Sequence, residues 1–390
     1  MVDQVDVVIV GAGLAGLVLG NLLRANGIDT LVLERSNREH VQTRARAGFL
    51  GPNSVRVLTK HGLGAGMLRN GRLHDTCAFR YADGEFELNY GKLGRGEVHT
   101  VYPQQNLVTD LIAEYLDRGG KLRFGVTVTE VDIETATVRF RDACGTGEAT
   151  GRYLAGCDGS NSITRQAMPA SRVTQYARDH GIAWLALLAE APPSMEAVTY
   201  AIHDNGFAGQ MARSPQVTRY YLQVHPHDDP AAWTDERIWA ELGVRMRIDQ
   251  FGPLRQGLVT ERRIVRLRSD VIDPIQYARL FLVGDAASLI SPSAAKGANL
   301  AILQAELLAG ALTDTLARDD DHALAAYSRT CLPRIWRAQE FSHWMTTLLH
   351  GPTGIDPDAG FQRGLCRARL DSLRDSRAHQ DFFAENYIGI

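Results

Sequence analysis

Apolar residues near the N-terminus recur first in the pattern of a buried strand and then in that of a helix. Val5–Val10 forms a short apolar run, and helical spacing then continues to about Ala25, where Gly27 ends the helix. Thr30–Leu33 is a second apolar run and is closed by Glu34. This order predicts a βαβ unit of about 30 residues.

The pattern changes further along the chain. Helical spacing recurs at Asp110–Leu116, from Asn299 to about Leu316, and over residues 322–350. Strand-like runs recur at Thr127–Ile133, Ala136–Phe140 and 279–283. Residues 178–225 differ, because three strand-like stretches follow one another there without a long helix. That arrangement favours an antiparallel sheet inserted between dinucleotide-domain segments.

We therefore predict an α/β protein with α+β elements. A discontinuous Rossmann-like dinucleotide-binding domain is expected from residues 1–72, 97–176 and 269–340. A mostly antiparallel sheet domain for the substrate is expected from residues 73–96 and 177–268, and a C-terminal helical region from 341–390.

Composition narrows the class of protein. The net charge of −3 predicts no affinity for nucleic acid or an anionic membrane, and no apolar run approaches the ~18 residues of a membrane helix. The five cysteines are odd in number and include no CxxC, which fits reduced thiols. The first strand starts by about Val5 and leaves no room for a signal peptide. We expect a cytoplasmic enzyme without a metal site.

The first chemical motif is GAGLAG, which matches GxGxxG at Gly11, Gly13 and Gly16. In such a turn the first glycine allows the tight bend, the second lets the backbone approach a pyrophosphate, and the third allows close helix packing. Glu34 follows at the spacing of a residue that accepts a ribose hydroxyl. A carboxylate there repels a 2′-phosphate, so this site favours FAD or NAD over NADP.

Two later segments also follow predicted strands. Cys157-Asp158-Gly159 taken alone is typical of a surface turn. Residues 284–300 read GDAASLISPSAAKGANL, in which Asp285 is placed to hydrogen-bond a flexible polyol. A helix starting near Asn299 would stabilise the anion of a reduced flavin ring. A second contact with the same dinucleotide is typical of flavoproteins that bind FAD along its whole length.

These motifs together resemble the class A flavoprotein aromatic hydroxylases, most nearly those of the p-hydroxybenzoate hydroxylase type. The resemblance covers nearly all of the chain and rests on the following segments: GxGxxG with Glu34-Arg35, Arg44-Ala45-Arg46-Ala47-Gly48, Asp158-Gly159, Gly284-Asp285-Ala286-Ala287, Pro292…Ala295-Lys296-Gly297, and Ala384-Glu385-Asn386-Tyr387.

The resemblance implies an FAD-dependent monooxygenase of aromatic catabolism. Such an enzyme uses NAD(P)H and O2 to hydroxylate 4-hydroxybenzoate at the 3-position through a flavin C4a-hydroperoxide, which gives 3,4-dihydroxybenzoate. Homodimers are common among these enzymes, so a homodimer is one option for this chain.

The resemblance also implies the cofactor contacts. Those to FAD fall on Gly11, Gly13, Gly16, Glu34, Arg35, Arg44, Gly48, Gln104, Asp158, Arg219, Asp285, Gly297, Ala298 and Asn299. The nicotinamide coenzyme is expected in a surface groove with Arg35, Arg44, Arg165 and Arg268, since arginine suits phosphate. Ser36 and His40 depart from the commonest residues at the 2′-phosphate position. NADPH is favoured, and NADH stays open.

The substrate site must hold a phenol and remove its proton, because the phenolate is the more electron-rich ring. By resemblance, Tyr200 and Tyr387 hydrogen-bond the phenol and pass on its proton, and His74 is the solvent end of this relay. The same resemblance implies that the carbonyl of Pro292 faces the ring and that Arg213 and Tyr221 contact the substrate carboxylate.

Three residues depart from the family pattern. Met211 stands where a serine usually donates to the carboxylate, and Val198 and Gly209 are smaller than the usual leucines. We expect extra room beside the ring, so 3,4-dihydroxybenzoate and 4-aminobenzoate remain alternative substrates; harmless drift in a repacked pocket is the simpler explanation. A flavin oxidoreductase that transfers no oxygen is the alternative from another class.

Overall fold

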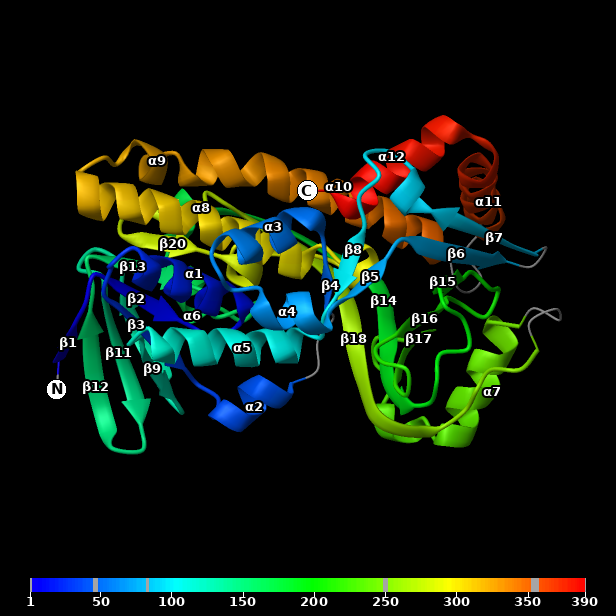
Figure 1. The fold of residues 1–390 in the computed structure, drawn as a ribbon, viewed down its shortest axis with the longest axis horizontal. Coiled ribbons are helices and arrows are strands. Elements are labelled where there is room, and N and C mark those ends of the chain that lie inside the picture. Colours follow the sequence, from blue (N-terminus) through cyan, green and yellow to red (C-terminus); the bar gives the residue numbers. More distant parts are fainter. Residues whose placement is uncertain (1, 45–47, 82–83, 248–251, 352–357, 390) are drawn as a thin grey trace.

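The computed structural model describes residues 2–44, 48–81, 84–247, 252–351 and 358–389. Its N-terminal part is built on a six-stranded sheet of order β19-β20-β13-β2-β3-β9, in which only the β19–β20 pair is antiparallel (Figure 1). The strands are β2 (Val7–Val10), β3 (Thr30–Glu34), β9 (Lys121–Phe124), β13 (Tyr153–Gly156), β19 (Gln276–Tyr277) and β20 (Leu280–Leu282).

The helix α1 (Leu14–Ala25) connects β2 to β3 and packs between α5 (Gln104–Asp117) and α8 (Gly297–Arg318). All four residues of β2 are buried, as expected for a strand of a parallel sheet covered by helices. The predicted βαβ unit is therefore present at nearly the predicted boundaries.

A second, eight-stranded sheet has the order β21-β18-β14-β17-β16-β15-β6-β7 and is antiparallel except for the β15–β6 pair. Its strands are β6 (Thr76–Tyr81), β7 (Gly84–Asn89), β14 (Thr174–Glu190), β15 (Val198–Ala201), β16 (Ala208–Ala212), β17 (Thr218–Val224), β18 (Leu258–Asp273) and β21 (Ser288–Leu289). The predicted boundaries at 176/177 and 268/269 fall inside β14 and β18, because these two long paired strands run through both regions.

Two smaller sheets complete the strand inventory of the described residues. One has the order β1-β12-β11-β10 and comprises β1 (Val2–Gln4), β10 (Thr127–Asp132), β11 (Thr137–Asp142) and β12 (Gly145–Thr150). The other has the order β4-β8-β5 and comprises β4 (Phe49–Leu50), β5 (Arg72–His74) and β8 (His99–Val101).

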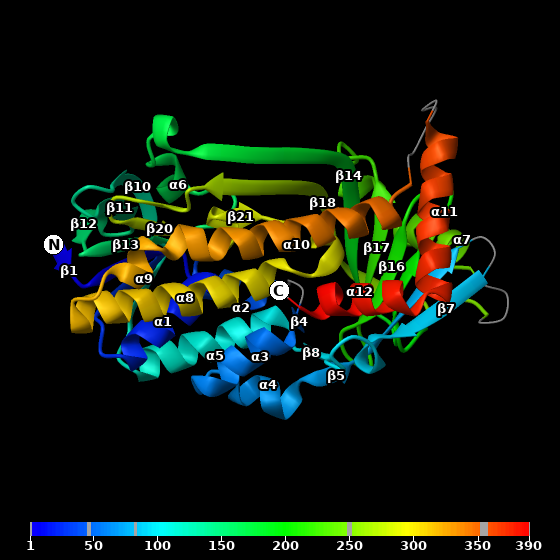
Figure 2. The same cartoon turned by 90° about the horizontal axis from the view of Figure 1, so that it is seen from above.

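The C-terminal helices are α9 (His322–Ala325), α10 (Tyr327–Leu349), α11 (Ala359–Asp375) and α12 (Arg377–Ile388). Figures 1 and 2 place α10 beside α8, and α11 and α12 over the eight-stranded sheet. The predicted boundary at 340/341 falls inside α10, which spans both regions as one helix.

The remaining helices are α2 (Arg38–Thr43), α3 (Pro52–Lys60), α4 (Ala65–Asn70), α6 (Ile163–Gln166) and α7 (Asp235–Arg245). Short 3₁₀ turns occur at η1 (Tyr90–Lys92), η2 (Ala170–Arg172), η3 (Pro230–Ala232), η5 (Gly284–Ala286) and η6 (Pro292–Ala294).

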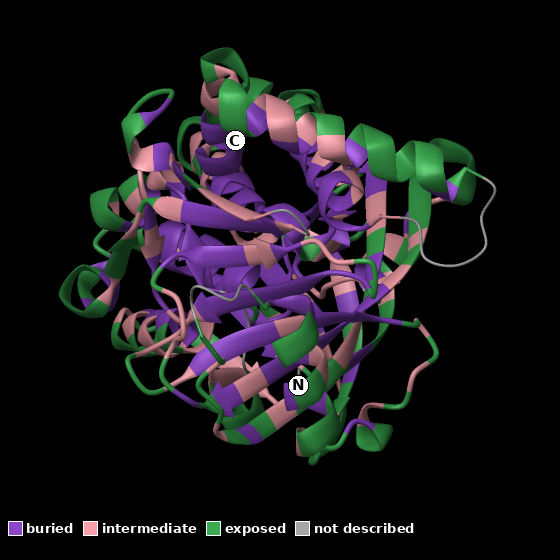
Figure 3. Ribbon diagram, turned by 90° about the vertical axis from the view of Figure 1, so that its right-hand side faces the viewer, coloured by how far each residue is buried: buried purple, intermediate pink, exposed green. Residues whose placement is uncertain are grey.

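Burial follows the layers, with the sheets and the inner helix faces buried and the outer faces exposed (Figure 3). The largest apolar core surrounds the parallel sheet with α1 and α8. A second core joins the eight-stranded sheet to α10 and α12 through Phe79, Phe341 and Phe383. Helix α8 has the length and apolar character of a membrane span, but 61% of its apolar window is buried inside the protein, as in a core helix.

Candidate active site

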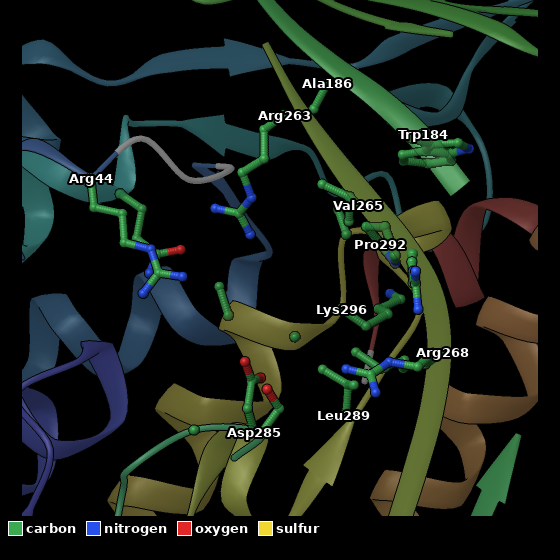
Figure 4. A pocket seen from close by; sticks show the side chains of 18 of the residues that line it. Arg44, Trp184, Ala186, Arg263, Val265, Arg268, Asp285, Leu289, Pro292 and Lys296 are labelled. Atoms are coloured by element: carbon green, nitrogen blue, oxygen red, sulfur yellow. The ribbon is translucent and has the colours of Figure 1, made fainter. Parts of the chain in front are cut away.

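A cavity of about 950 Å³ lies where the two large sheets meet (Figure 4). Its wall is assembled from distant segments, including the turn after β2, the end of β3, the loop after β13 and the segment after β20. Most of the predicted site residues line it: Gly11, Gly13, Glu34, Arg35, Arg44, Gln104, Asp158, Val198, Tyr200, Gly209, Met211, Arg219, Tyr221, Arg268, Asp285, Pro292, Gly297, Ala298 and Tyr387.

The three glycines of GAGLAG have different surroundings. Gly11 has a φ of +104°, and a Cβ there would lie 2.4 Å from the carbonyl oxygen of Cys157. A Cβ on Gly16 would lie 2.0 Å from the carbonyl oxygen of Gly11, so Gly16 belongs to the helix packing behind the wall. A Cβ on Gly13 would meet no atom within 4 Å. The side of the turn at Gly13 is therefore open for a ligand to approach the backbone.

Glu34 connects the end of β3 to this turn. Its two carboxylate oxygens accept hydrogen bonds from the backbone N–H groups of Ala12, at 2.9 Å, and Ser36, at 2.8 Å. Each oxygen retains a second lone pair, and the residue is only partly buried. The carboxylate is thus held in a fixed position on the cavity wall.

Asp158 lines the cavity, and its carboxylate also holds the loop after β13 in place. It accepts hydrogen bonds from the hydroxyl of Ser162, at 2.6 Å, and from the hydroxyl and backbone N–H of Thr164, at 2.9 and 3.0 Å. Arg165 lies behind the wall and donates to the carbonyl of Ser160 at 2.6 Å. These bonds fix the backbone of residues 158–160 at the cavity.

Asn299 has a different position from the one expected, because α8 begins at Gly297 and places this side chain behind the wall. Its Oδ1 accepts from the N–H of Gly51 at 2.8 Å and the hydroxyl of Ser54 at 2.7 Å. Its amide nitrogen donates to the carbonyls of Phe49, at 3.1 Å, and Ala295, at 3.0 Å. Asn299 therefore ties the segment around β4 to the start of α8.

Gly48 also lies behind the wall. A Cβ there would lie 2.0 Å from the carbonyl oxygen of Tyr102, and the Gly48 carbonyl accepts from the N–H of Tyr102 at 2.8 Å. Residues 45–47 of the predicted Arg44–Gly48 motif lie outside the described residues.

Tyr200 and Tyr387 meet in the cavity wall with their hydroxyl oxygens 2.7 Å apart. Burial raises the pKa of both phenols, so both are protonated at neutral pH. His74 is not hydrogen-bonded to either tyrosine. Its Nδ1 lies 2.8 Å from the Tyr90 hydroxyl, and its Nε2 accepts from the backbone N–H of Val198 at 3.3 Å.

A cationic region adjoins this pair of tyrosines. Arg219 is 5% exposed, its Nη2 lies 3.5 Å from Glu261, and its Nε has no hydrogen-bond partner among the described residues. Burial and the nearby charge of Arg219 lower the pKa of Arg213 to about 10, against the opposing effects of Tyr221 and Glu261. Arg213 itself follows β16 and lies outside the cavity wall. Both guanidinium groups lie near Glu261, so two positive charges are close to this carboxylate.

The space beside Gly209 is filled, contrary to the expectation of extra room. A Cβ on Gly209 would lie 2.9 Å from Cζ of Phe207. The ring of Phe207 in turn stacks on Trp184 with centroids 5.2 Å apart. Gly209 therefore accommodates this ring, and the smaller side chain does not by itself enlarge the site.

Some cavity residues carried no sequence signal. Trp184 and Phe207 belong to apolar stretches that look like ordinary sheet core, and Arg263 is one of several arginines in a charged strand. Figure 4 shows Arg44 and Arg263 projecting into the cavity from opposite sides. These side chains line the same cavity as the glycine turn, and Trp184 and Arg263 reach it from the paired strands β14 and β18.

Comparison with known proteins shows to which class of proteins this chain belongs. The FAD binding domain family matches residues 4–342. The chain is 31% identical to p-hydroxybenzoate hydroxylase of Acinetobacter baylyi, over 99% of this chain and 96% of that protein. It is 28% identical to 3-amino-4-hydroxybenzoate 2-monooxygenase PtnB3 of Streptomyces platensis, over 89% of each chain. In fold, it matches p-nitrophenol 4-monooxygenase PnpA of Pseudomonas putida with a TM-score of 0.84, at 18% identity and 99% coverage of both chains.

The chain belongs to the class A FAD-dependent aromatic hydroxylases and is a flavoprotein monooxygenase. The predicted family and α/β fold class are thereby confirmed. The cavity fits FAD for two reasons. The backbone at Gly13 is accessible at the N-terminus of a helix, where a phosphate can bind. The cavity volume is at the upper end of the range for small-molecule sites.

The role of Asn299 can be tested by Asn299→Ala. We expect the free energy of unfolding of the cofactor-free protein to fall by about 1–3 kcal/mol, because buried partners of the amide lose their hydrogen bonds. Urea denaturation measures this loss, with Asn205→Ala in an exposed turn as the matched control. Equal stability of the two variants would show that the Asn299 contacts contribute nothing measurable.

Proposed function

We propose that this protein hydroxylates 4-hydroxybenzoate at the 3-position, with NADPH as the favoured reductant and O2 as the oxidant, and forms 3,4-dihydroxybenzoate. The observation that carries the proposal is the hydroxyl pair of Tyr200 and Tyr387, which shares one cavity with the glycine turn and adjoins a cationic region. The name and full-length similarity of the Acinetobacter relative support the same substrate.

The FAD contacts would come from segments at the ends of strands of the six-stranded sheet and from the start of α8. The turn at Gly11 and Gly13 would hold the pyrophosphate, Glu34 a ribose hydroxyl, and Asp285 the polyol. Gly297 and Ala298 would place the N-terminus of α8 at the ring system. When bound, FAD supplies the redox chemistry that activates O2.

The substrate carboxylate would be held near Arg213, Arg219 and Tyr221. Two buried guanidinium groups close together favour an anionic partner, because an anion offsets both their desolvation and their mutual repulsion. A 4-hydroxybenzoate anchored there would direct its phenol toward Tyr200. Met211 supplies no hydroxyl donor to the carboxylate at this site, which leaves the arginines as the main anchor.

The tyrosine pair would remove the phenol proton. As the substrate O–H gives its proton to the oxygen of Tyr200, Tyr200 would give its own proton to Tyr387, and Tyr387 would give its own proton to water that carries it to solvent. The pair would then stay neutral while one proton leaves the site. The resulting phenolate is more electron-rich than the phenol. Pro292 and the ring of Trp184 line the same cavity and help to exclude water from the reacting ring.

The nicotinamide coenzyme would bind at arginines that line the cavity. Arg35, Arg44 and Arg268 line the cavity, whereas Arg165 supports the loop behind it. Arginine binds phosphate oxygens through two parallel hydrogen bonds, which suits a dinucleotide. Arg263 projects toward Arg44 and extends this basic surface.

The direct test is a panel of benzoates with the FAD-loaded protein. We expect 4-hydroxybenzoate to stimulate NADPH oxidation and to yield 3,4-dihydroxybenzoate, identified by product chromatography. Preferred turnover of 3,4-dihydroxybenzoate or 4-aminobenzoate would replace the proposed substrate with one of these. Oxidation of NADPH without any hydroxylated product from the panel would instead favour a flavin oxidoreductase that transfers no oxygen.

Tyr200→Phe tests the proton-transfer step. The variant keeps the ring but removes the hydroxyl, so we expect the hydroxylation rate to fall at least tenfold, within the range for loss of acid–base catalysis. The dissociation constant for FAD is expected to stay within about twofold, because the hydroxyl is not among the proposed FAD contacts. Tyr327→Phe is the matched control, since it removes another buried hydroxyl, which donates to the carbonyl of Leu282 at 3.0 Å. Unchanged product yield with Tyr200→Phe would exclude the tyrosine pair as the base.

Arg213→Ala tests the carboxylate anchor. Removal of one of two neighbouring cations is expected to raise the dissociation constant for 4-hydroxybenzoate at least tenfold, on the order of 1.4 kcal/mol or more. Equilibrium titration of the FAD-loaded protein measures this change. Arg318→Ala, at a position 72% exposed on the end of α8, serves as the control for loss of an arginine. A change below tenfold would argue against Arg213 as the anchor.

A further inference from the structure

A buried chain of hydrogen bonds lies beside the tyrosine pair and involves two residues that no motif singled out, Tyr90 and His99. His74 on β5 and His99 on β8 are paired across the small sheet, and Tyr90 in η1 lies between their rings. The Tyr90 hydroxyl is 2.8 Å from Nδ1 of His74 and 3.1 Å from Nδ1 of His99. Tyr90 is 0% and His99 2% exposed.

The partners at both ends of this chain assign its protons. The backbone carbonyl of Tyr387 favours a proton on the His99 ring, because it opposes the lowering of the pKa of His99. We infer that this proton is on Nε2 of His99, which leaves Nδ1 to accept from the Tyr90 hydroxyl at 3.1 Å. At the other end, the N–H of Val198 donates to Nε2 of His74, so Nδ1 of His74 carries the proton and donates to Tyr90.

Charge and burial keep this arrangement neutral. Burial lowers the pKa of His74 to about 4, against a smaller opposing effect of Asp75. Burial, Lys296 and His74 lower the pKa of His99 well below its usual range. The Tyr90 hydroxyl also lies 2.7 Å from the backbone carbonyl of His74, which is its alternative acceptor. The titratable groups facing the chain from the elements packed against it are Asp75, Cys77, Tyr200, Lys296 and Tyr387.

The chain ends on the main chain of Tyr387. Nζ of Lys296 donates to the carbonyl of Tyr387 at 2.9 Å, and the same carbonyl favours a proton on the His99 ring by opposing the lowering of its pKa. The rings of Tyr90 and His99 both contact the Tyr387 ring edge-on, with centroid distances of 5.2 and 5.1 Å. These contacts hold the ring whose hydroxyl lies 2.7 Å from that of Tyr200.

We propose that Tyr90 and His99 are positioning residues for substrate deprotonation, which hold Tyr387 on Tyr200 through a neutral His74–Tyr90–His99 chain. The inference rests on the proposed function, because the tyrosine pair matters for turnover only if a phenol loses its proton there. The hydrogen-bond chain itself is a property of the free protein and can be measured without substrate.

The first experiment measures the histidine tautomers in the free protein by NMR of ¹⁵N-histidine-labelled samples. At pH 7 we expect His74 as the neutral Nδ1–H form and His99 as the neutral form protonated on its other nitrogen, with signals assigned from the His74→Gln and His99→Gln spectra. Tyr90→Phe should shift both signals, and Tyr327→Phe neither. A charged His99, an Nδ1–H form of His99, or signals unaffected by Tyr90→Phe would overturn the chain.

The second experiment measures kcat against pH for His99→Leu and His99→Gln. His99→Leu should lower kcat at least tenfold near neutral pH, and the loss should shrink as pH approaches about 10, where a phenol ionises in solution without the relay. His99→Gln should restore at least half of the rate, since its amide both donates to Tyr387 and accepts from Tyr90.

A loss of kcat equal at every pH, or equal for Leu and Gln, would show general structural damage and overturn the positioning role. The two readouts separate the two proposals. If the wild-type protein hydroxylates no benzoate, the proposed function fails, and with it the role in deprotonation, whereas the tautomers still decide whether the neutral chain exists.

Discussion

The short segment after β20 is the physical constraint on which the rest of the site depends. The chain leaves the parallel sheet at Leu282 and enters the eight-stranded sheet at Ser288. Between them, Gly284 has a φ of +66°, and its N–H donates to the side chain of Gln304 at 2.7 Å. A Cβ at Gly284 would come within 3.2 Å of Ala15 and 3.4 Å of Ala301, so the segment is packed between α1 and α8. This segment therefore holds the part of the cavity proposed to bind the cofactor against the part proposed to bind the substrate.

The site has two electrostatic environments that suit the two ends of a hydroxybenzoate. Near Arg213 and Arg219, two positive charges lie close to the carboxylate of Glu261, an arrangement that would favour an anion. Around Tyr200 and Tyr387, burial raises the pKa of the phenols and favours neutral groups that pass a proton without holding a charge. This difference explains how one cavity would bind a carboxylate firmly and still activate the phenol opposite it.

Much of the site depends on side chains that hold its wall in place through hydrogen bonds. Asp158 fixes its loop through Ser162 and Thr164, and Asn299 ties the segment around β4 to α8. Motif matching places such residues among the cofactor contacts because they are adjacent to the wall in sequence. The direction in which such a side chain points depends on hydrogen-bond partners that lie as far as 250 positions away.

The sequence by itself determined the βαβ unit, the family and the set of wall segments, because the turn, strand and helix signals there are local. Gly11, for example, adopts a positive φ in the turn, which glycine does without steric cost. Only the tertiary structure decided that β14 and β18 run unbroken through the predicted domain boundaries and that Phe207 fills the space at Gly209. It also decided that the ring of His74 meets the hydroxyl of Tyr90. These features depend on contacts between residues far apart in the chain, and no local pattern of apolar and polar positions encodes which of many buried side chains will meet.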